Sequence, residues 1–93
     1  MNDKNSLIEY LKSEKFDKKI LNAFSIVKRE DFLPEGLRDY AYIDQPLPIG
    51  DGVTISQPYT IAFMLSLLEL KDNQKILEIG SGSGYVLGLI NKI

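Results

Sequence analysis

Apolar residues recur at helical spacing in the first third of the chain, and this pattern predicts two helices. The apolar positions of the first, within residues 6–12, are Leu7, Ile8 and Leu11. Asp17 is a suitable N-cap for the second helix, because its carboxylate can accept from the free N–H groups of a first turn. The apolar face of this helix consists of Ile20, Leu21, Phe24 and Val27. Pro34 and Gly36 then end a helical segment that we expect to cover residues 1–40.

Residues 41–58 carry a different pattern, which is rich in proline and glycine. The two prolines before residue 50 lack the backbone N–H that a central strand requires. The stretch Gly50–Gly52 is typical of a tight turn. Residues 47–49 and 53–55 are therefore predicted to form the two arms of a small irregular hairpin, although an ordinary surface loop has the same composition.

The last third of the chain predicts a helix, a strand and a second helix. The first helix begins near Ser56, with this serine as N-cap and Pro58 in the first turn. Its apolar face comprises Ile61, Met64, Leu65, Leu68 and Leu70. Residues 76–79 form a short apolar strand of the kind found in parallel α/β sheets covered on both faces. A glycine-rich loop follows at residues 80–84, and Tyr85 begins the second helix.

Composition and charge are those of a single globular domain. The chain has 93 residues, of which 44% are hydrophobic and 26% charged, and its formal net charge is −2, so a basic footprint for nucleic acid is absent. The interleaved charges expected on a solvated helical face are Lys12, Glu14, Lys15, Asp17, Lys18 and Lys19. The N-terminus is polar and residues 61–70 are too few to span a bilayer, so we expect a cytoplasmic protein without a membrane segment.

The chain contains neither cysteine nor histidine. The first absence excludes disulfides, thiolate catalysis and zinc–thiolate sites, and no metal site is expected. The second removes the usual general base near neutral pH. Any chemistry must therefore proceed without such a base or borrow one from elsewhere.

The glycine run after the expected strand favours a ligand held against the backbone, because glycine permits positive φ and close approach. A nucleoside triphosphate loop needs a lysine directly after its glycines, and the next lysine here is Lys92. A dinucleotide loop needs G-x-G-x-x-G; Gly80 and Gly82 fit, but Tyr85 stands where the third glycine is required. This weakens a nicotinamide-dependent oxidoreductase as an alternative and leaves S-adenosylmethionine as the third candidate ligand.

Residues 76–85, Ile-Leu-Glu-Ile-Gly-Ser-Gly-Ser-Gly-Tyr, resemble the E/D-x-G-x-G-x-G motif of Rossmann-like methyltransferases. Residues 28–34, 41–42, 46–50 and 54–59 are similar to protein-L-isoaspartate O-methyltransferases in particular. The resemblance implies an α/β fold that is the N-terminal part of a Rossmann-like methyltransferase. In this interpretation residues 41–93 supply the substrate loop and the start of the S-adenosylmethionine-binding domain.

The resemblance also assigns roles to individual residues. The glycine-loop positions that would hold the methionyl part of S-adenosylmethionine are Gly80, Ser81, Gly82, Ser83 and Gly84. Glu78 matches the acidic residue that helps to orient this loop and the cofactor, and its ordinary alternative is an exposed strand carboxylate. Thr54, Ile55 and Ser56 match the active-site stretch beside the cofactor. The catalytic serine maps onto Ser56, which could also cap a helix, since a hydroxyl both accepts and donates.

The implied reaction is methyl transfer from S-adenosylmethionine to the carboxyl group of L-isoaspartyl residues in damaged proteins and peptides. This carboxylate is ionised at neutral pH and needs no general base, which suits a chain without histidine. Ser56 would orient the carboxylate by a hydrogen bond and would not attack it, because no basic partner is available. Asp51 and Val53 match the segment that walls the substrate pocket, although their simpler interpretation is as turn residues.

The chain ends at Ile93, inside the helix after the glycine loop. The ribose and adenine contacts implied by the resemblance lie beyond this point. We therefore expect a truncated N-terminal portion that is marginally folded and inactive alone, and a monomer in its full-length form. The alternative is a non-catalytic helical module that docks onto another protein, with the glycines as a helix-entry loop.

Overall fold

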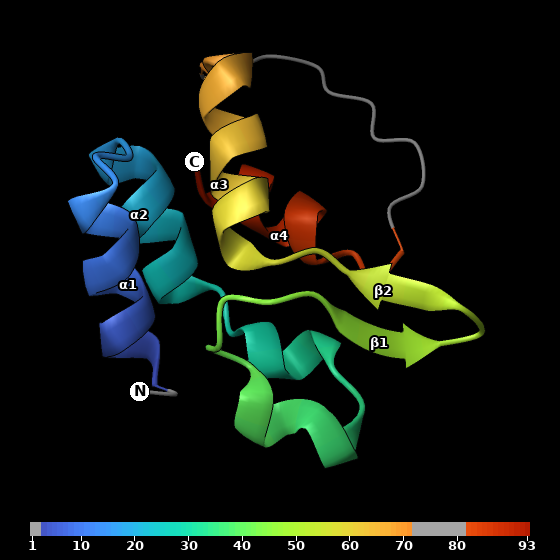
Figure 1. Cartoon of the computed structure of the whole chain (residues 1–93). Helices are drawn as coiled ribbons and strands as arrows, with labels where there is room; N and C mark the ends of the chain where they lie inside the picture. The colour runs from blue at the N-terminus through green and yellow to red at the C-terminus, as the bar shows by residue number, and fades with distance from the viewer. Residues whose placement is uncertain (1–2, 72–81) are drawn as a thin grey trace.

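The computed structural model describes residues 3–71 and 82–93 (Figure 1). Its elements, in chain order, are α1 Lys4–Ser13, α2 Lys18–Ile26, the 3-10 helices η1 Arg29–Phe32 and η2 Glu35–Tyr40, the strands β1 Leu47–Gly50 and β2 Val53–Ile55, α3 Pro58–Leu68 and α4 Tyr85–Lys92. Helix α2 contacts α1, α3 and α4, and the hairpin of β1 and β2 projects on the side away from α1 and α2 (Figure 1).

Helices α1 and α2 confirm the two helices predicted from the apolar spacing. Each begins at an aspartate whose carboxylate accepts from a backbone N–H of the first turn, which stabilises the helix start. Asp3 Oδ1 accepts from the Ser6 N–H at 2.8 Å, and Asp17 Oδ1 accepts from the Lys19 N–H at 3.1 Å. The interleaved charged residues between Lys12 and Lys19 are exposed, as expected for a solvated face.

The 3-10 helices were not predicted. The sequence indicated only that Pro34 and Gly36 end the helical region, whereas two short helices, η1 and η2, surround Pro34. Neither has a side-chain cap, and neither carries the apolar periodicity that marks a longer helix. Their importance comes from Arg29, the first residue of η1, which is fully buried.

The predicted hairpin is confirmed. Strands β1 and β2 pair antiparallel, with Leu47 opposite Ile55, and the register is irregular between Pro48 and Gly50. The two-residue turn consists of Asp51 at φ 51° and Gly52 at φ 73°. Positive φ at both positions is the requirement of the tight turns that best match strand twist, and Asp-Gly is a preferred sequence for them.

The N-cap of helix α3 lies one residue later than the sequence predicted. Its N-cap is Gln57 and Pro58 is its first residue, so the expectation that Ser56 caps this helix is wrong. The proline fits because the first helical position needs no intrahelical donor. Helix α4 begins at Tyr85, as predicted, after Gly84 in the left-handed conformation. The strand expected at residues 76–79 lies outside the described residues. The Rossmann-like sheet therefore stays a prediction, and the described part contains helices and one two-stranded antiparallel sheet.

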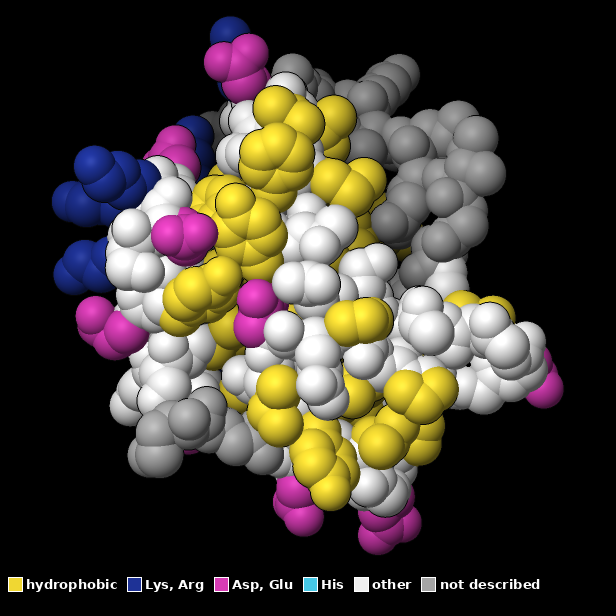
Figure 2. Space-filling view, in the orientation of Figure 1, with side chains coloured by type: hydrophobic (Ala, Val, Ile, Leu, Met, Phe, Trp, Pro, Cys, Tyr) yellow, Lys and Arg dark blue, Asp and Glu magenta, His cyan; other side chains and the backbone are white. Residues whose placement is uncertain are grey.

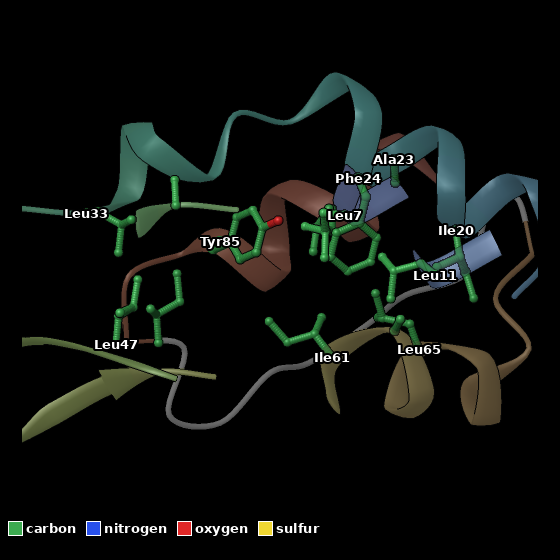
Figure 3. Close-up of a cluster of buried hydrophobic side chains, with 14 residues drawn as sticks. Leu7, Leu11, Ile20, Ala23, Phe24, Leu33, Leu47, Ile61, Leu65 and Tyr85 are labelled. Atoms are coloured by element: carbon green, nitrogen blue, oxygen red, sulfur yellow. The ribbon is translucent and has the colours of Figure 1, made fainter. Parts of the chain in front are cut away.

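One hydrophobic core joins the helices to the hairpin (Figure 3). Its buried members are Leu7, Leu11, Ile20, Ala23, Phe24, Leu33, Ala41, Leu47, Ile55, Ile61, Ala62, Leu65, Tyr85 and Leu89. In Figure 3 Tyr85 lies between Leu47 of β1 and Phe24 of α2. Tyr85, the first residue after the glycine loop, thus lies between the hairpin side and the helical side of the core.

One face of α3 remains exposed and apolar. Its exposed hydrophobic residues are Phe63, Met64, Leu67 and Leu68, and Figure 2 shows hydrophobic side chains gathered over this helix. Within residues 3–71 and 82–93, no helix is long and apolar enough to cross a membrane.

The hairpin turn yields a stability prediction with a matched control. A Cβ added at Gly52 or at Gly36 meets no atom within 4 Å, but only Gly52 has a positive φ. We expect Gly52→Ala to lower the free energy of unfolding by ~1–2 kcal/mol through backbone strain alone, and Gly36→Ala not to lower it. Urea unfolding of both variants measures the difference. Equal effects would contradict the assigned turn.

Candidate active site

The predicted active-site stretch lies at the end of the hairpin. Thr54 and Ser56 are exposed, and Ile55 between them is buried in the core opposite Leu47. This alternation follows from the two-residue period of a strand. The buried isoleucine fixes the segment, and the two hydroxyl-bearing residues are presented to solvent. Asp51 and Val53 are also exposed, at the turn of the same hairpin.

The Ser56 hydroxyl is not used to cap α3. The cap is supplied by Asp44, whose Oδ1 accepts from the Tyr59 N–H at 2.7 Å and whose Oδ2 accepts from Gln57 Nε2 at 3.3 Å. No partner within the described residues engages Ser56 Oγ, while the Ser56 carbonyl accepts from Arg29. The backbone of Ser56 is therefore held and its hydroxyl is available to a ligand.

Arg29 holds that backbone from the interior. Its guanidinium donates four hydrogen bonds to main-chain carbonyls. The acceptors are Ala41 at 2.8 Å, Ile43 at 3.3 Å, Gln45 at 3.1 Å and Ser56 at 3.1 Å. Burial lowers the pKa of Arg29, but the guanidinium stays protonated, because its ordinary pKa lies far above neutrality. The four carbonyl dipoles face this retained positive charge.

A second contact fixes the loop of residues 41–45. The Tyr42 hydroxyl donates to Glu30 Oε1, and Lys4 Nζ lies 5.4 Å from the centroid of the Tyr42 ring. Burial acts to raise the pKa of Glu30, but the hydrogen bond from Tyr42, a backbone hydrogen bond and the charges of Lys4 and Lys28 together outweigh it, and the pKa lies below its ordinary value of 4.5. Burial, and then the neighbouring Glu30, raise the pKa of Tyr42. The loop is thus tied to α1 and η1 as well as to α3.

In the described part of the glycine loop, two glycines adopt the positive φ that favours glycine over other residues. Gly82 and Gly84 have φ of 56° and 84°, which L side chains rarely adopt. A Cβ at Gly84 would meet no atom within 4 Å, so its backbone can be approached by a ligand. Ser83 Oγ accepts from the Tyr85 N–H at 3.1 Å and so satisfies one donor at the start of α4. Glu78, Gly80 and Ser81 lie outside the described residues.

Tyr85 connects the glycine loop to η1. Its ring centroid lies 5.4 Å from that of Phe32 and 6.3 Å from that of Phe24. Burial raises the pKa of Tyr85, and neither Tyr85 Oη nor Arg29 Nε has a hydrogen-bond partner among the described residues. Helix η1 therefore contacts both predicted halves of the site, through Arg29 at Ser56 and through Phe32 at Tyr85.

Sequence reasoning missed Arg29 and Asp44. Arg29 belongs to residues 28–34, which were recognised only as a stretch that resembles a family, and Asp44 lies between the two matching stretches 41–42 and 46–50; neither side chain was given a role. A single sequence offers no signal that separates the buried Arg29 from the exposed Arg38, since both belong to polar stretches with helical turns. Their contacts span 12 to 27 positions along the chain, far beyond any local pattern.

Comparison with known proteins places the chain among methyltransferases. The family model described as protein-L-isoaspartate(D-aspartate) O-methyltransferase matches residues 2–93. A protein-L-isoaspartate O-methyltransferase of Petrotoga mobilis is 60% identical over 77 residues, which is 83% of this chain and 36% of that protein. One from Roseiflexus sp. is 42% identical over 93 residues, which is 99% of this chain and 43% of that protein. One from Anaeromyxobacter sp. is 51% identical over 74 residues, or 80% and 30% of the two chains.

The chain belongs to the protein-L-isoaspartate O-methyltransferase family. The resemblance inferred from the sequence is thereby confirmed. The matched region covers between 30% and 43% of the length of these three relatives. The activity of a whole enzyme is therefore a proposal for this chain, as are the roles of its residues.

The capping role of Asp44 can be tested with an isosteric control. We expect Asp44→Ala to lower the free energy of unfolding by ~1 kcal/mol, because α3 loses the acceptor for its first turn. Asp44→Asn keeps an oxygen at the same place and should lose less. Urea unfolding measures stability, and hydrogen exchange measures protection of the Tyr59 amide. Unchanged protection in the alanine variant would refute the cap.

The Tyr42–Glu30 hydrogen bond predicts a pH-dependent stability. Because the folded-state pKa of Glu30 is lowered, the contribution is present above the unfolded-state pKa and is lost as pH falls through the folded value. We expect Tyr42→Phe to be less stable than wild type at pH 7, with a difference that shrinks well below pH 4.5. Tyr40→Phe, at an exposed position, is the control. A difference that does not vary with pH in urea unfolding would contradict the assignment.

Proposed function

We propose that residues 1–93 supply part of the substrate and cofactor site of a protein-L-isoaspartate O-methyltransferase. The reaction is methyl transfer from S-adenosylmethionine to the carboxylate of L-isoaspartyl residues in proteins and peptides. The observation that carries the proposal is the state of Ser56, whose backbone is fixed by Arg29 while its hydroxyl is exposed and free of the α3 cap. This side chain suits the binding of a substrate carboxylate.

Ser56 acts by orientation. Its hydroxyl donates a hydrogen bond to one oxygen of the isoaspartyl carboxylate and leaves the other free to accept the methyl group. The carboxylate is already the anionic nucleophile at neutral pH, so no residue has to remove a proton. When S-adenosylmethionine is bound, its sulfonium supplies an activated methyl group, and the S–CH₃ bond breaks as the O–CH₃ bond forms. Catalysis then consists mainly of holding two reactants in line.

The glycine loop would hold the cofactor through its backbone. The positive φ of Gly82 and Gly84 and the open space at Gly84 fit a ligand pressed against the main chain. Glu78, Gly80 and Ser81 are proposed to share this role, and Thr54 and Ile55 to lie beside the cofactor with Ser56. Residues 1–93 alone are proposed to be inactive, because the ribose and adenine contacts implied by the family fall outside them.

A second candidate is a non-catalytic module that binds another protein. The exposed apolar face of α3 favours it, since Phe63, Met64 and Leu67 lie together on one helix and are each about half exposed or more. The two candidates differ in what they require of the glycine loop. Only the enzyme needs its backbone conformation for ligand binding.

Ser56→Ala and Gly82→Val test the enzyme in the protein expressed from its intact gene. We expect Ser56→Ala to reduce methylation of an isoaspartyl peptide about 10- to 100-fold, since a hydrogen bond to a charged group is worth ~1.5–3 kcal/mol. Ser56→Thr, which keeps a hydroxyl, should lose less. Gly82→Val should abolish S-adenosylmethionine binding in calorimetry, while Gly36→Ala preserves it. Equal methylation of the matching aspartyl peptide, or cofactor binding by Gly82→Val, would sink the proposal.

A further inference from the structure

We propose that Arg29 is a positioning residue for methyl transfer, because its buried guanidinium fixes the main chain at Ser56. This inference rests on the proposed function for its effect on catalysis, but its structural part can be tested without any activity. Sequence reasoning assigned no role to Arg29, and the residue lies 27 positions before the serine that it holds.

Ser56 occupies a stretch that secondary structure leaves unfixed. The hairpin register ends at the pair Leu47 and Ile55, and α3 begins only at Pro58. Neither strand pairing nor helical hydrogen bonding therefore sets the position of residue 56. Two long-range contacts do so instead. Arg29 Nη2 donates to the Ser56 carbonyl, and Asp44 accepts from the Tyr59 N–H on the far side of the stretch.

The geometry of the guanidinium suits this task. Nη1 donates to two carbonyls and Nη2 to two others, so one planar group with a fixed fork relates four backbone positions to one another. Three of the acceptors lie in residues 41–45, the loop that also carries Asp44. The guanidinium therefore links the Ser56 carbonyl to the loop that carries Asp44, the second support of this stretch.

The role of Arg29 is one of geometry and not of ion pairing. Among the residues that the structure describes, no carboxylate hydrogen-bonds to the guanidinium. The ionisable groups whose charges act to raise the pKa of Arg29, against the larger effect of burial, are Tyr85, Asp44 and Tyr42. A lysine would keep the positive charge but present a single ammonium with three donors, which cannot reach four carbonyls in one plane. Arg29→Lys therefore separates the fork geometry from the charge.

The same short helix reaches the glycine loop. Phe32, three residues after Arg29, packs on the ring of Tyr85, which directly follows Gly84. Helix η1 thus relates the serine that would face the substrate to the loop that would face the cofactor. Methyl transfer depends on the relation between these two ligands, because a displacement of about 1 Å from the in-line geometry can cost about 100-fold in rate.

The test compares Arg29→Lys with Leu11→Ala in the protein expressed from its intact gene. Leu11 is a buried residue of α1 that lies outside the proposed site. We expect its truncation to lower stability and to leave the four carbonyl contacts of Arg29 intact. At a temperature where both variants stay folded, we expect Arg29→Lys to lower kcat about 100-fold with a smaller change in the KM for S-adenosylmethionine. Leu11→Ala should leave kcat near the wild-type value. Equal losses of kcat in the two variants would overturn the proposal.

A measurement on the wild-type protein keeps the inference testable if Arg29→Lys does not fold. Four hydrogen bonds should stop rotation of the guanidinium, so NMR should resolve separate, slowly exchanging Nη1 and Nη2 protons for Arg29. Averaged, rapidly exchanging signals would refute the carbonyl contacts. If these signals are resolved but wild-type protein methylates no isoaspartyl peptide, the proposed function fails, and with it the catalytic part of the inference, while Arg29 remains the support of Ser56.

Discussion

The structure depends most on the need to satisfy one buried positive charge, the guanidinium of Arg29. A charge removed from water is tolerated only when polar partners surround it. Here those partners are main-chain carbonyls of residues 41–45 and of Ser56. Because backbone atoms supply the acceptors, the loop must take one course around the guanidinium whatever its side chains are. The hydrogen bonds of the buried Arg29 thereby determine the path of the chain from η2 to the hairpin.

Because the backbone of residues 41–45 is held in place, two of its side chains can form contacts with other elements. Asp44 accepts a hydrogen bond from the first turn of α3, as an N-cap side chain would, so the Ser56 hydroxyl is not needed for the cap. Tyr42 reaches back to Glu30 beside the arginine. The polar side chains of Tyr42 and Asp44 thus stabilise the loop and α3. The hydroxyls of Thr54 and Ser56 are exposed and take no part in these contacts.

The features that could be predicted from the sequence are those that depend on residues close together along the chain. The helix starts at Asp17 and Tyr85 and the Asp51–Gly52 turn each depend on residues within four positions, and each was found. The cap at Ser56 was assigned wrongly by the same reasoning, because a serine two residues before a proline is a good local cap, whereas the actual acceptor, Asp44, lies 15 positions before the Tyr59 N–H that it accepts from. Arg29 escaped notice for the same reason. The family was recognised because motif residues are read directly, without any knowledge of contacts.

The burial of Tyr85 also gives the protein an optical property. The chain has no tryptophan and five tyrosines, all of them in the described part, and Tyr85 is the one among them that is fully buried. Its ring is held against Phe24 and Phe32 in an asymmetric setting, directly after the glycine loop. The near-ultraviolet signal of the folded protein should therefore include a contribution from this side chain that disappears when its packing is lost. Circular dichroism in this range therefore reports on the packing of the residue that directly follows the glycine loop, without any added label.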